Sequence, residues 1–138
     1  MSLALEQAKK TLGNTKDNPA VGCIIVKNNY VISAGYTSIG GRPHAEQNAI
    51  KKVNKNIQNL KLYVTLEPCS NYGKTPPCVN LIINKKIKNV FFSINDPDTR
   101  SFKKSSIKFK KSGINTNSGI LFNKFRMHFS KGKTSRRI

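Results

Sequence analysis

Apolar residues follow two spacing patterns along the chain. Some stretches are short, continuous and rich in β-branched residues, as in Ala20–Val26, and this is typical of buried strands. Others repeat an apolar residue every three or four positions, as in Pro43–Val53, and this is typical of a helix with one buried face. Gly13 is expected to end the first helix. The pattern predicts strands over residues 20–26, 30–36, 60–66, 87–94 and 114–116, and helices over residues 3–12, 43–53, 76–83, 102–111 and 120–129.

The order of these elements indicates an α/β fold. The first two strands are separated only by Lys27, Asn28 and Asn29, so they are expected to form an antiparallel hairpin. After residue 30, strands and helices alternate, which favours parallel pairing of strands 60–66 and 87–94 through a helical crossover. Ligands of such sheets bind beyond the carboxyl ends of the strands.

Length and composition agree with one folded unit. A chain of 138 residues is long enough to bury a core without disulfide bonds. We find no internal repeat and no linker between two cores, so we expect one domain over residues 1–129 and a basic tail over residues 130–138. No run of 18 apolar residues predicts a membrane span, and the N-terminus does not resemble a signal peptide. Three cysteines, an odd number, argue against a secreted disulfide framework and indicate a reducing cytoplasm.

The formal net charge is +19, from 25 basic and 6 acidic residues. Such a charge is typical of proteins that bind nucleic acid. Here the lysines are spread along the whole chain among many asparagines, as codon use in an AT-rich genome would produce, and no aromatic platform for base stacking is visible. We therefore favour a solvated lysine surface. A nucleic-acid footprint and simple attraction of a phosphorylated small substrate stay open as alternatives.

Three residues with metal-binding side chains, His44, Cys69 and Cys78, stand in two short segments with the sequences PHAE and TLEPCSNYGKTPPC. Catalytic zinc is held by three protein ligands, and its fourth position takes a water whose pKa falls toward about 7. A spare carboxylate, Glu46, can take a proton from that water and pass it to the substrate. Nucleobase deaminases carry this arrangement of ligands and glutamate. The sequence therefore predicts a zinc-dependent deaminase.

The remaining candidate residues have simpler interpretations. Glu67 also lies two residues from a predicted ligand and competes for the role of base, but we favour a structural role in which backbone groups hold it. Asp96 and Asp98 share the loop after strand 87–94. This loop lies at the carboxyl ends of the strands, where we expect the ligand to bind. Cys23 is expected in the core and His128 on the surface of the last helix.

Longer segments carry a closer match. The chain resembles the deaminase domain of the bifunctional riboflavin-biosynthesis proteins, within the cytidine and deoxycytidylate deaminase superfamily, over about residues 4–125. Eight residues between the two cysteines are the most specific signal, because other deaminases of the superfamily usually have two there. The matching segments are NPAVGC (18–23), HAE (44–46), TLEPC (65–69), GKTPPC (73–78) and Asp96–Pro97.

This resemblance implies a three-layer α/β/α fold with a mixed sheet of about five strands, a bound zinc ion, and dimers or larger assemblies. It implies hydrolysis of 2,5-diamino-6-(5-phosphoribosylamino)pyrimidin-4-one to 5-amino-6-(5-phosphoribosylamino)uracil. By matching position, Asn18, Lys74 and Asp96 would bind the substrate, and Asp98 stands where the family tends to have asparagine. Lys74 would offer a cation to the phosphoribosyl group or to an electron-rich edge of the ring.

Three departures affect the predicted pocket. The family normally has histidine at the position of Asn71, often histidine at that of Tyr36, and asparagine at that of Asp98. A reductase domain follows in the bifunctional proteins, through a segment like residues 122–125. We therefore expect either an isolated deaminase domain or a truncated chain, and no binding of the nicotinamide cofactor. The alternatives are a deaminase of another nucleobase, such as cytidine, deoxycytidylate or tRNA adenosine, and a degenerate zinc domain without catalysis.

Overall fold

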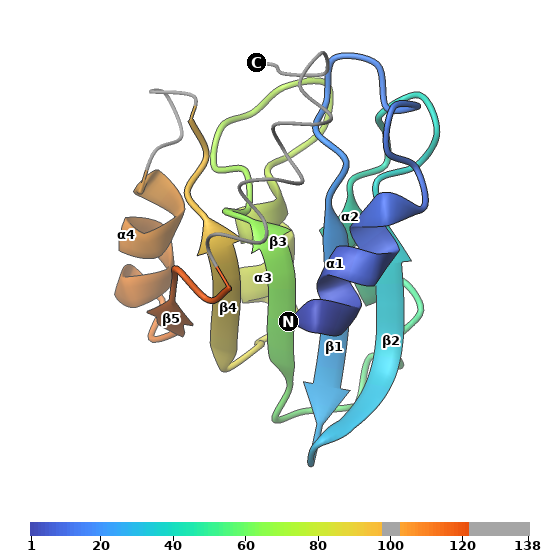
Figure 1. The fold of residues 1–138 in the computed structure, drawn as a ribbon. Helices are drawn as coiled ribbons and strands as arrows, with labels where there is room; N and C mark the ends of the chain where they lie inside the picture. The colour runs from blue at the N-terminus through green and yellow to red at the C-terminus, as the bar shows by residue number, and fades with distance from the viewer. Residues whose placement is uncertain (98–102, 122–138) are drawn as a thin grey trace.

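The structure is a computed structural model, and it describes residues 1–97 and 103–121. Within these ranges five strands form one sheet in the order β2-β1-β3-β4-β5, and helices lie on both of its faces (Figure 1). The five predicted strands are present, and most of the fifth predicted helix, 120–129, lies outside the described residues. The elements are α1 (Ser2–Lys9), β1 (Gly22–Lys27), β2 (Tyr30–Tyr36), α2 (Ala45–Ile50), β3 (Lys61–Leu66), α3 (Cys78–Asn84), β4 (Asn89–Ile94), α4 (Lys104–Lys111) and β5 (Asn115–Asn117).

The sheet is mixed. β1 pairs antiparallel with both β2 and β3, whereas the β3–β4 and β4–β5 pairs are parallel. The predicted hairpin is confirmed: Asn28 and Asn29 form its two-residue turn with φ of 51° and 67°. Two residues with positive φ give a turn whose twist matches that of the strands, and asparagine tolerates this conformation. The predicted parallel pairing of β3 with β4 is also confirmed.

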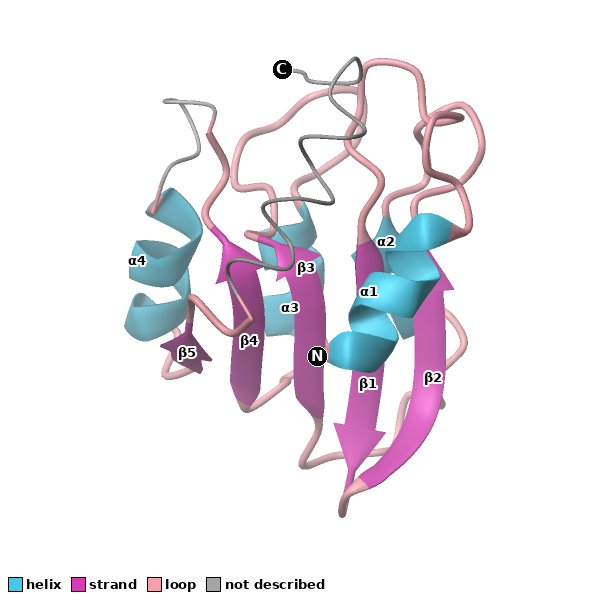
Figure 2. Ribbon diagram, in the orientation of Figure 1, coloured by secondary structure: helices cyan, strands magenta, loops and turns pink. Residues whose placement is uncertain are grey.

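Three layers are visible in Figure 2: α1 covers one face of the sheet, and α2 and α3 cover the other. Along β3, Leu62 and Val64 point to the α2–α3 side and are fully buried. Phe109 of α4 joins the same core. The alternation of side chains along each strand therefore supplies apolar surface to both helical layers. The buried core on the α2–α3 side consists of Val21, Cys23, Ile25, Ala45, Ala49, Ile50, Leu60, Leu62, Val64, Leu66, Val79, Ile82, Ile87, Val90, Phe92, Phe109 and Ile114.

Two glycines set how closely the helices approach the sheet. A Cβ atom at Gly22 would overlap the carbonyl oxygen of Ala4 in α1. On the other face, a Cβ atom at Gly35 would lie 2.5 Å from the carbonyl oxygen of Ala45 in α2. Only glycine permits these contacts between backbones. Gly35 thus positions α2, the helix that follows His44.

The first helix is shorter than predicted. It ends at Lys9, and Gly13 follows in a turn with φ of 86°. The buried hydroxyl of Thr11 donates a hydrogen bond to the carbonyl oxygen of Thr37, over 2.7 Å, and draws the chain toward the end of β2. The expected stop of the helix at Gly13 was therefore wrong: the regular helix ends at Lys9, and tighter turns, with the N–H of Leu12 bonded to the carbonyl oxygen of Lys9, carry the chain on to Gly13.

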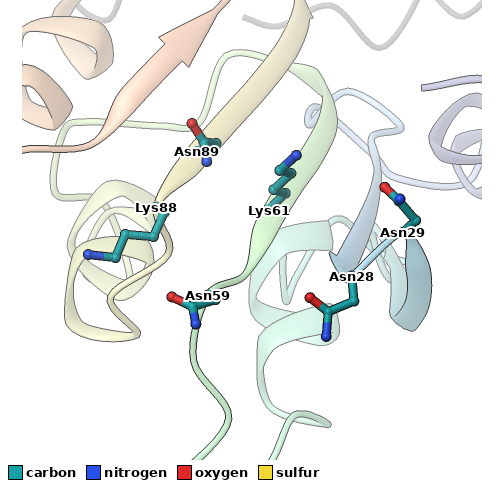
Figure 3. A pocket seen from close by; sticks show the side chains of 6 residues that line it. All are labelled: Asn28, Asn29, Asn59, Lys61, Lys88 and Asn89. Atoms are coloured by element: carbon teal, nitrogen blue, oxygen red, sulfur yellow. The ribbon is translucent and has the colours of Figure 1, made fainter.

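A polar hollow of about 420 Å³ lies at the amino ends of β3 and β4 (Figure 3). This is the end of the sheet opposite the loops that follow those two strands. The residues that line the hollow are asparagines and lysines: Asn28, Asn29, Asn59, Lys61, Lys88 and Asn89.

No helix among the described residues is long and apolar enough to cross a membrane.

Candidate metal centre

Three separate segments meet beyond the carboxyl end of β3. His44 is the residue that precedes α2, Cys69 lies in the loop after β3, and Cys78 is the first residue of α3. Their ligand atoms all lie within 4.8 Å of one another, so the structure brings the three predicted metal ligands together. Among the described residues this is the one group of three or more such side chains with this geometry.

The spacing of the donor atoms fits zinc. Nδ1 of His44 lies 3.8 Å from Sγ of Cys69 and 3.6 Å from Sγ of Cys78. Tetrahedral zinc with ordinary Zn–N and Zn–S bond lengths separates such atoms by about 3.6 Å. One imidazole and two thiols are also the ligand types that catalytic zinc takes, with the fourth position left for water or substrate.

The two thiols differ in acidity. A hydrogen bond from the Cys78 thiol lowers the pKa of Cys69 to about 4, and the same contact raises the pKa of Cys78 well above its ordinary value. The backbone N–H of Cys78 also donates to Sγ of Cys69, over 3.1 Å. One thiolate is thus stabilised by the fold, and a bound divalent cation would deprotonate the second thiol as well.

Glu46 lies in the first turn of α2 and is 4% exposed. Burial, followed by the negative charge of Cys69, raises the pKa of its carboxyl group to about 7. A carboxyl group whose pKa lies close to neutral can both accept and release a proton at physiological pH. Its electrostatic interactions with Cys69 and His44 indicate that it lies near the metal donors, as the predicted proton transfer requires.

Glu67 is committed to structural hydrogen bonds. It is 2% exposed, and one carboxylate oxygen accepts bonds from the backbone N–H groups of Asp96 and Lys103 and from the amide of Asn95. The other oxygen accepts bonds from the N–H and hydroxyl groups of Ser105. These bonds tie the end of β3 to the loop after β4 and to the start of α4, and they agree with the structural role that we favoured for this residue.

Hydrogen bonds from one side chain of α2 connect this helix to the end of β2 and to the segment that precedes the helix. The side-chain amide of Asn48 donates to the carbonyl oxygen of Tyr36 over 2.8 Å, to the hydroxyl of Ser38 over 2.9 Å and to the carbonyl oxygen of Pro43 over 3.3 Å. The peptide bond between Arg42 and Pro43 is cis. These contacts place the imidazole-bearing segment against the sheet.

Three of the predicted substrate-binding residues lie on three separate loops. Asn18 is half-buried, and its amide donates to the carbonyl oxygen of Gly41, over 2.9 Å, in the segment that approaches His44. Lys74 is exposed, and Asp96 is half-buried on the loop that Glu67 anchors. Asp98 lies outside the described residues, as does His128.

The sequence did not single out Arg42. Its guanidinium Nη1 donates to the hydroxyl of Thr75, over 3.2 Å, and so links the segment before α2 to the loop between the two cysteines. A signal was present, because Arg42 is the only arginine among the first 99 residues of a lysine-rich chain. Cys23 is fully buried as expected, and burial raises the pKa of its thiol.

Comparison with known proteins places this geometry in a family. A family model described as the cytidine and deoxycytidylate deaminase zinc-binding region matches residues 1–94, the range that contains all three donor residues and Glu46. The chain belongs to the cytidine and deoxycytidylate deaminase family. Zinc is accordingly its cofactor, and the His44, Cys69 and Cys78 group fits that ion.

Within this deaminase family, proteins of riboflavin biosynthesis are similar over most of the chain. A diaminohydroxyphosphoribosylaminopyrimidine deaminase of Buchnera aphidicola is 39% identical over 132 residues, which cover 96% of this chain and 89% of that protein. The riboflavin biosynthesis protein RibD of Bacillus amyloliquefaciens is 38% identical over 137 residues, which cover 95% of this chain and 37% of that protein. The crystal structure of a diaminohydroxyphosphoribosylaminopyrimidine deaminase/5-amino-6-(5-phosphoribosylamino)uracil reductase of Thermotoga maritima matches with a TM-score of 0.90 at 39% identity, covering 97% of this chain and 39% of that chain.

These comparisons confirm the predicted fold and enzyme class. The α/β fold with its mixed five-stranded sheet is that of the Thermotoga maritima structure. The Buchnera aphidicola and Thermotoga maritima proteins are named as deaminases, and the chain is a hydrolytic deaminase of the same family. The chain spans about a third of the length of the first curated relatives that it matches, 31% of a Zea mays protein and 37% of the Bacillus amyloliquefaciens protein.

Proposed function

We propose that this deaminase hydrolyses 2,5-diamino-6-(5-phosphoribosylamino)pyrimidin-4-one to 5-amino-6-(5-phosphoribosylamino)uracil and ammonia. The observation that carries the proposal is the Buchnera aphidicola relative, whose name states this activity and whose length the chain covers to 89% at 39% identity. Three grouped metal donors and the buried carboxyl group of Glu46, which interacts electrostatically with Cys69 and His44, support the chemistry that the reaction needs.

His44, Cys69 and Cys78 would hold the zinc ion in this scheme. When bound, zinc acts as a Lewis acid that lowers the pKa of a water molecule toward about 7. The carboxyl group of Glu46 takes a proton from the attacking water and delivers protons to a ring nitrogen and then to the departing amine. One water is consumed, the C–NH₂ bond breaks, a carbonyl forms and ammonia leaves.

The remaining residues orient the substrate. The side-chain amide of Asn18 donates an N–H to the carbonyl oxygen of Gly41. We therefore assign its amide oxygen to a hydrogen bond with the substrate. Asp96 is assigned to a polar edge of the pyrimidine, on a loop whose position the Glu67 carboxylate sets. We assign Lys74 to the phosphoribosyl group, and Asp98 keeps its assignment from the family resemblance.

The setting of the enzyme follows from the same residues. Three free cysteines, two of them proposed zinc ligands, support a reducing compartment such as the cytoplasm. We propose that the chain acts on a small phosphoribosylated pyrimidine and that it assembles as a homo-oligomer, by analogy with the family resemblance.

A side-by-side assay tests the proposed substrate. Ammonia release is measured with the diaminopyrimidinone ribotide and with cytidine, and zinc content is determined on the same sample. We expect release from the ribotide and little from cytidine. A preference for cytidine would reject the proposed substrate and favour another nucleobase, a result that the departures at Tyr36 and Asn71 would then explain. No release from either substrate by zinc-loaded protein would favour a domain without catalysis.

A further inference from the structure

Arg42 carries a positive charge at the rim of the metal centre, and neither the family resemblance nor the proposed mechanism uses it. Its Nη1 atom donates to the hydroxyl of Thr75, over 3.2 Å. Its Nη2 atom lies 3.6 Å from the position that a Cβ atom on Gly73 would occupy. The guanidinium therefore lies along the loop between the two cysteines, and Lys74 stands between the two residues that it reaches.

The guanidinium has no carboxylate partner in residues 1–97 and 103–121, where the only ion pair joins Lys9 to Glu6. A guanidinium offers five N–H donors, and the hydrogen bond to Thr75 uses one of them. The half-buried side chain is held in place by that bond, so less rotational freedom is lost when a ligand binds. A second cation, Lys74, is exposed on the adjoining loop.

We propose that Arg42 is a specificity residue that binds the phosphate group of the substrate, with Lys74 as the second cation. The inference rests on the proposed function, whose substrate carries one phosphate on a ribosyl arm. Arginine is suited to this task because its planar fork can bond two phosphate oxygens at once, whereas lysine acts as a point charge.

The polar hollow at the amino ends of β3 and β4 cannot take this phosphate. Figure 3 shows that Lys61 and Lys88 line it beside four asparagines. It lies at the amino ends of β3 and β4, a full strand length of about 20 Å from the metal donors. A ribosyl arm attached to a ring at the metal centre does not span that distance, whereas Arg42 is two residues from His44.

Kinetics of the Arg42→Gln variant test the assignment. The zinc-loaded enzyme is assayed with the ribotide and with the corresponding riboside, which lacks the phosphate. We expect KM for the ribotide to rise about tenfold or more, with kcat within twofold and the KM for the riboside unchanged. Arg42→Lys should recover part of the loss, because the charge returns without the fork.

Lys61→Gln is the matched control, since it removes one positive charge from the far hollow and should leave both KM values unchanged. An equal loss with ribotide and riboside in Arg42→Gln would show that the arginine only holds the loop, and would overturn the inference. Unchanged KM values in that variant would overturn it as well.

A binding experiment separates this inference from the proposed function. Calorimetry with ribose 5-phosphate and with ribose reports on the phosphate subsite without any turnover. We expect the wild-type chain to prefer the phosphorylated sugar and Arg42→Gln to lose that preference. Equal affinity for the two sugars in the wild type overturns the inference, whatever substrate the enzyme deaminates. Failure of the wild type to deaminate the ribotide, with the sugar preference intact, rejects only the proposed substrate.

Discussion

The backbone N–H of Cys78 donates a hydrogen bond to the Sγ atom of Cys69, over 3.1 Å. The next N–H along α3, that of Val79, donates to the carbonyl oxygen of Cys69, over 3.2 Å. Together the two bonds close the base of the loop that separates the two cysteines. Backbone N–H groups thus hold Cys69 against the start of α3, and a side-chain change within the loop leaves both bonds available.

Replacement of Cys78 by serine should remove the metal. A hydroxyl is a poor zinc ligand compared with a thiolate, so zinc measured by elemental analysis should fall well below one ion per chain. Cys23→Ala is the control, because that buried thiol packs in the core and is not one of the three donors. Full zinc content in Cys78→Ser would show that the ligand set is wrong.

Replacement of Glu46 by glutamine should abolish proton transfer and spare the metal. The amide matches the carboxyl group in shape but cannot carry a proton between water and substrate, so kcat should fall by roughly 10²–10⁴-fold. Zinc content should stay near one per chain. Glu6→Gln serves as the comparison, since its exposed pair with Lys9, at 3.4 Å, contributes little to stability. Retained turnover in Glu46→Gln would exclude this residue as the proton shuttle.

Replacement of Glu67 by glutamine should destabilise the domain without removing zinc. The new NH₂ group would face N–H donors where a carboxylate oxygen now accepts them, and the loss should be about 2–4 kcal/mol. Chemical denaturation followed by circular dichroism measures this change. If stability is unaffected while activity disappears, Glu67 takes part in catalysis and our structural assignment is wrong.

Replacement of Gly35 by alanine should displace α2 and weaken zinc binding at the metal centre. The added methyl group would meet the backbone of α2 at 2.5 Å, and the helix must move with a cost of about 1–3 kcal/mol. Because His44 immediately precedes that helix, zinc affinity should fall as well. Gly22→Ala meets α1 on the opposite face and should destabilise the fold while sparing zinc affinity in the molecules that remain folded. Equal effects of the two variants on zinc affinity would contradict this coupling through α2.

Patterning along the chain was sufficient to predict the five strands and the metal donors, but not the order of the strands in the sheet. The β-branched runs predicted β2 with its observed bounds, and the spacing of one histidine and two cysteines predicted three side chains that do meet. These features are local or nearly so, because strand faces repeat every two residues and the zinc ligands belong to short motifs.

Contacts between distant segments could not be predicted in this way. The bond from Thr11 to Thr37 spans 26 residues. The link from Arg42 to Thr75 spans 33 residues, and the bonds from Ser105 to Glu67 span 38. No periodicity in a single sequence encodes such pairs, since each depends on how the layers pack. Of the predicted substrate-binding residues, Asp98 lies outside the described part of the chain.

The exposed loop between the two cysteines has a consequence for limited proteolysis. Residues 71–76 are all exposed and present a surface that a protease can reach, whereas both flanking cysteines are held at the metal centre. A single cut there would give two fragments whose ends share one zinc ion and adjacent layers of the same core. The nicked protein should migrate as one species on a native gel and as two in denaturant, and a chelator should speed its dissociation.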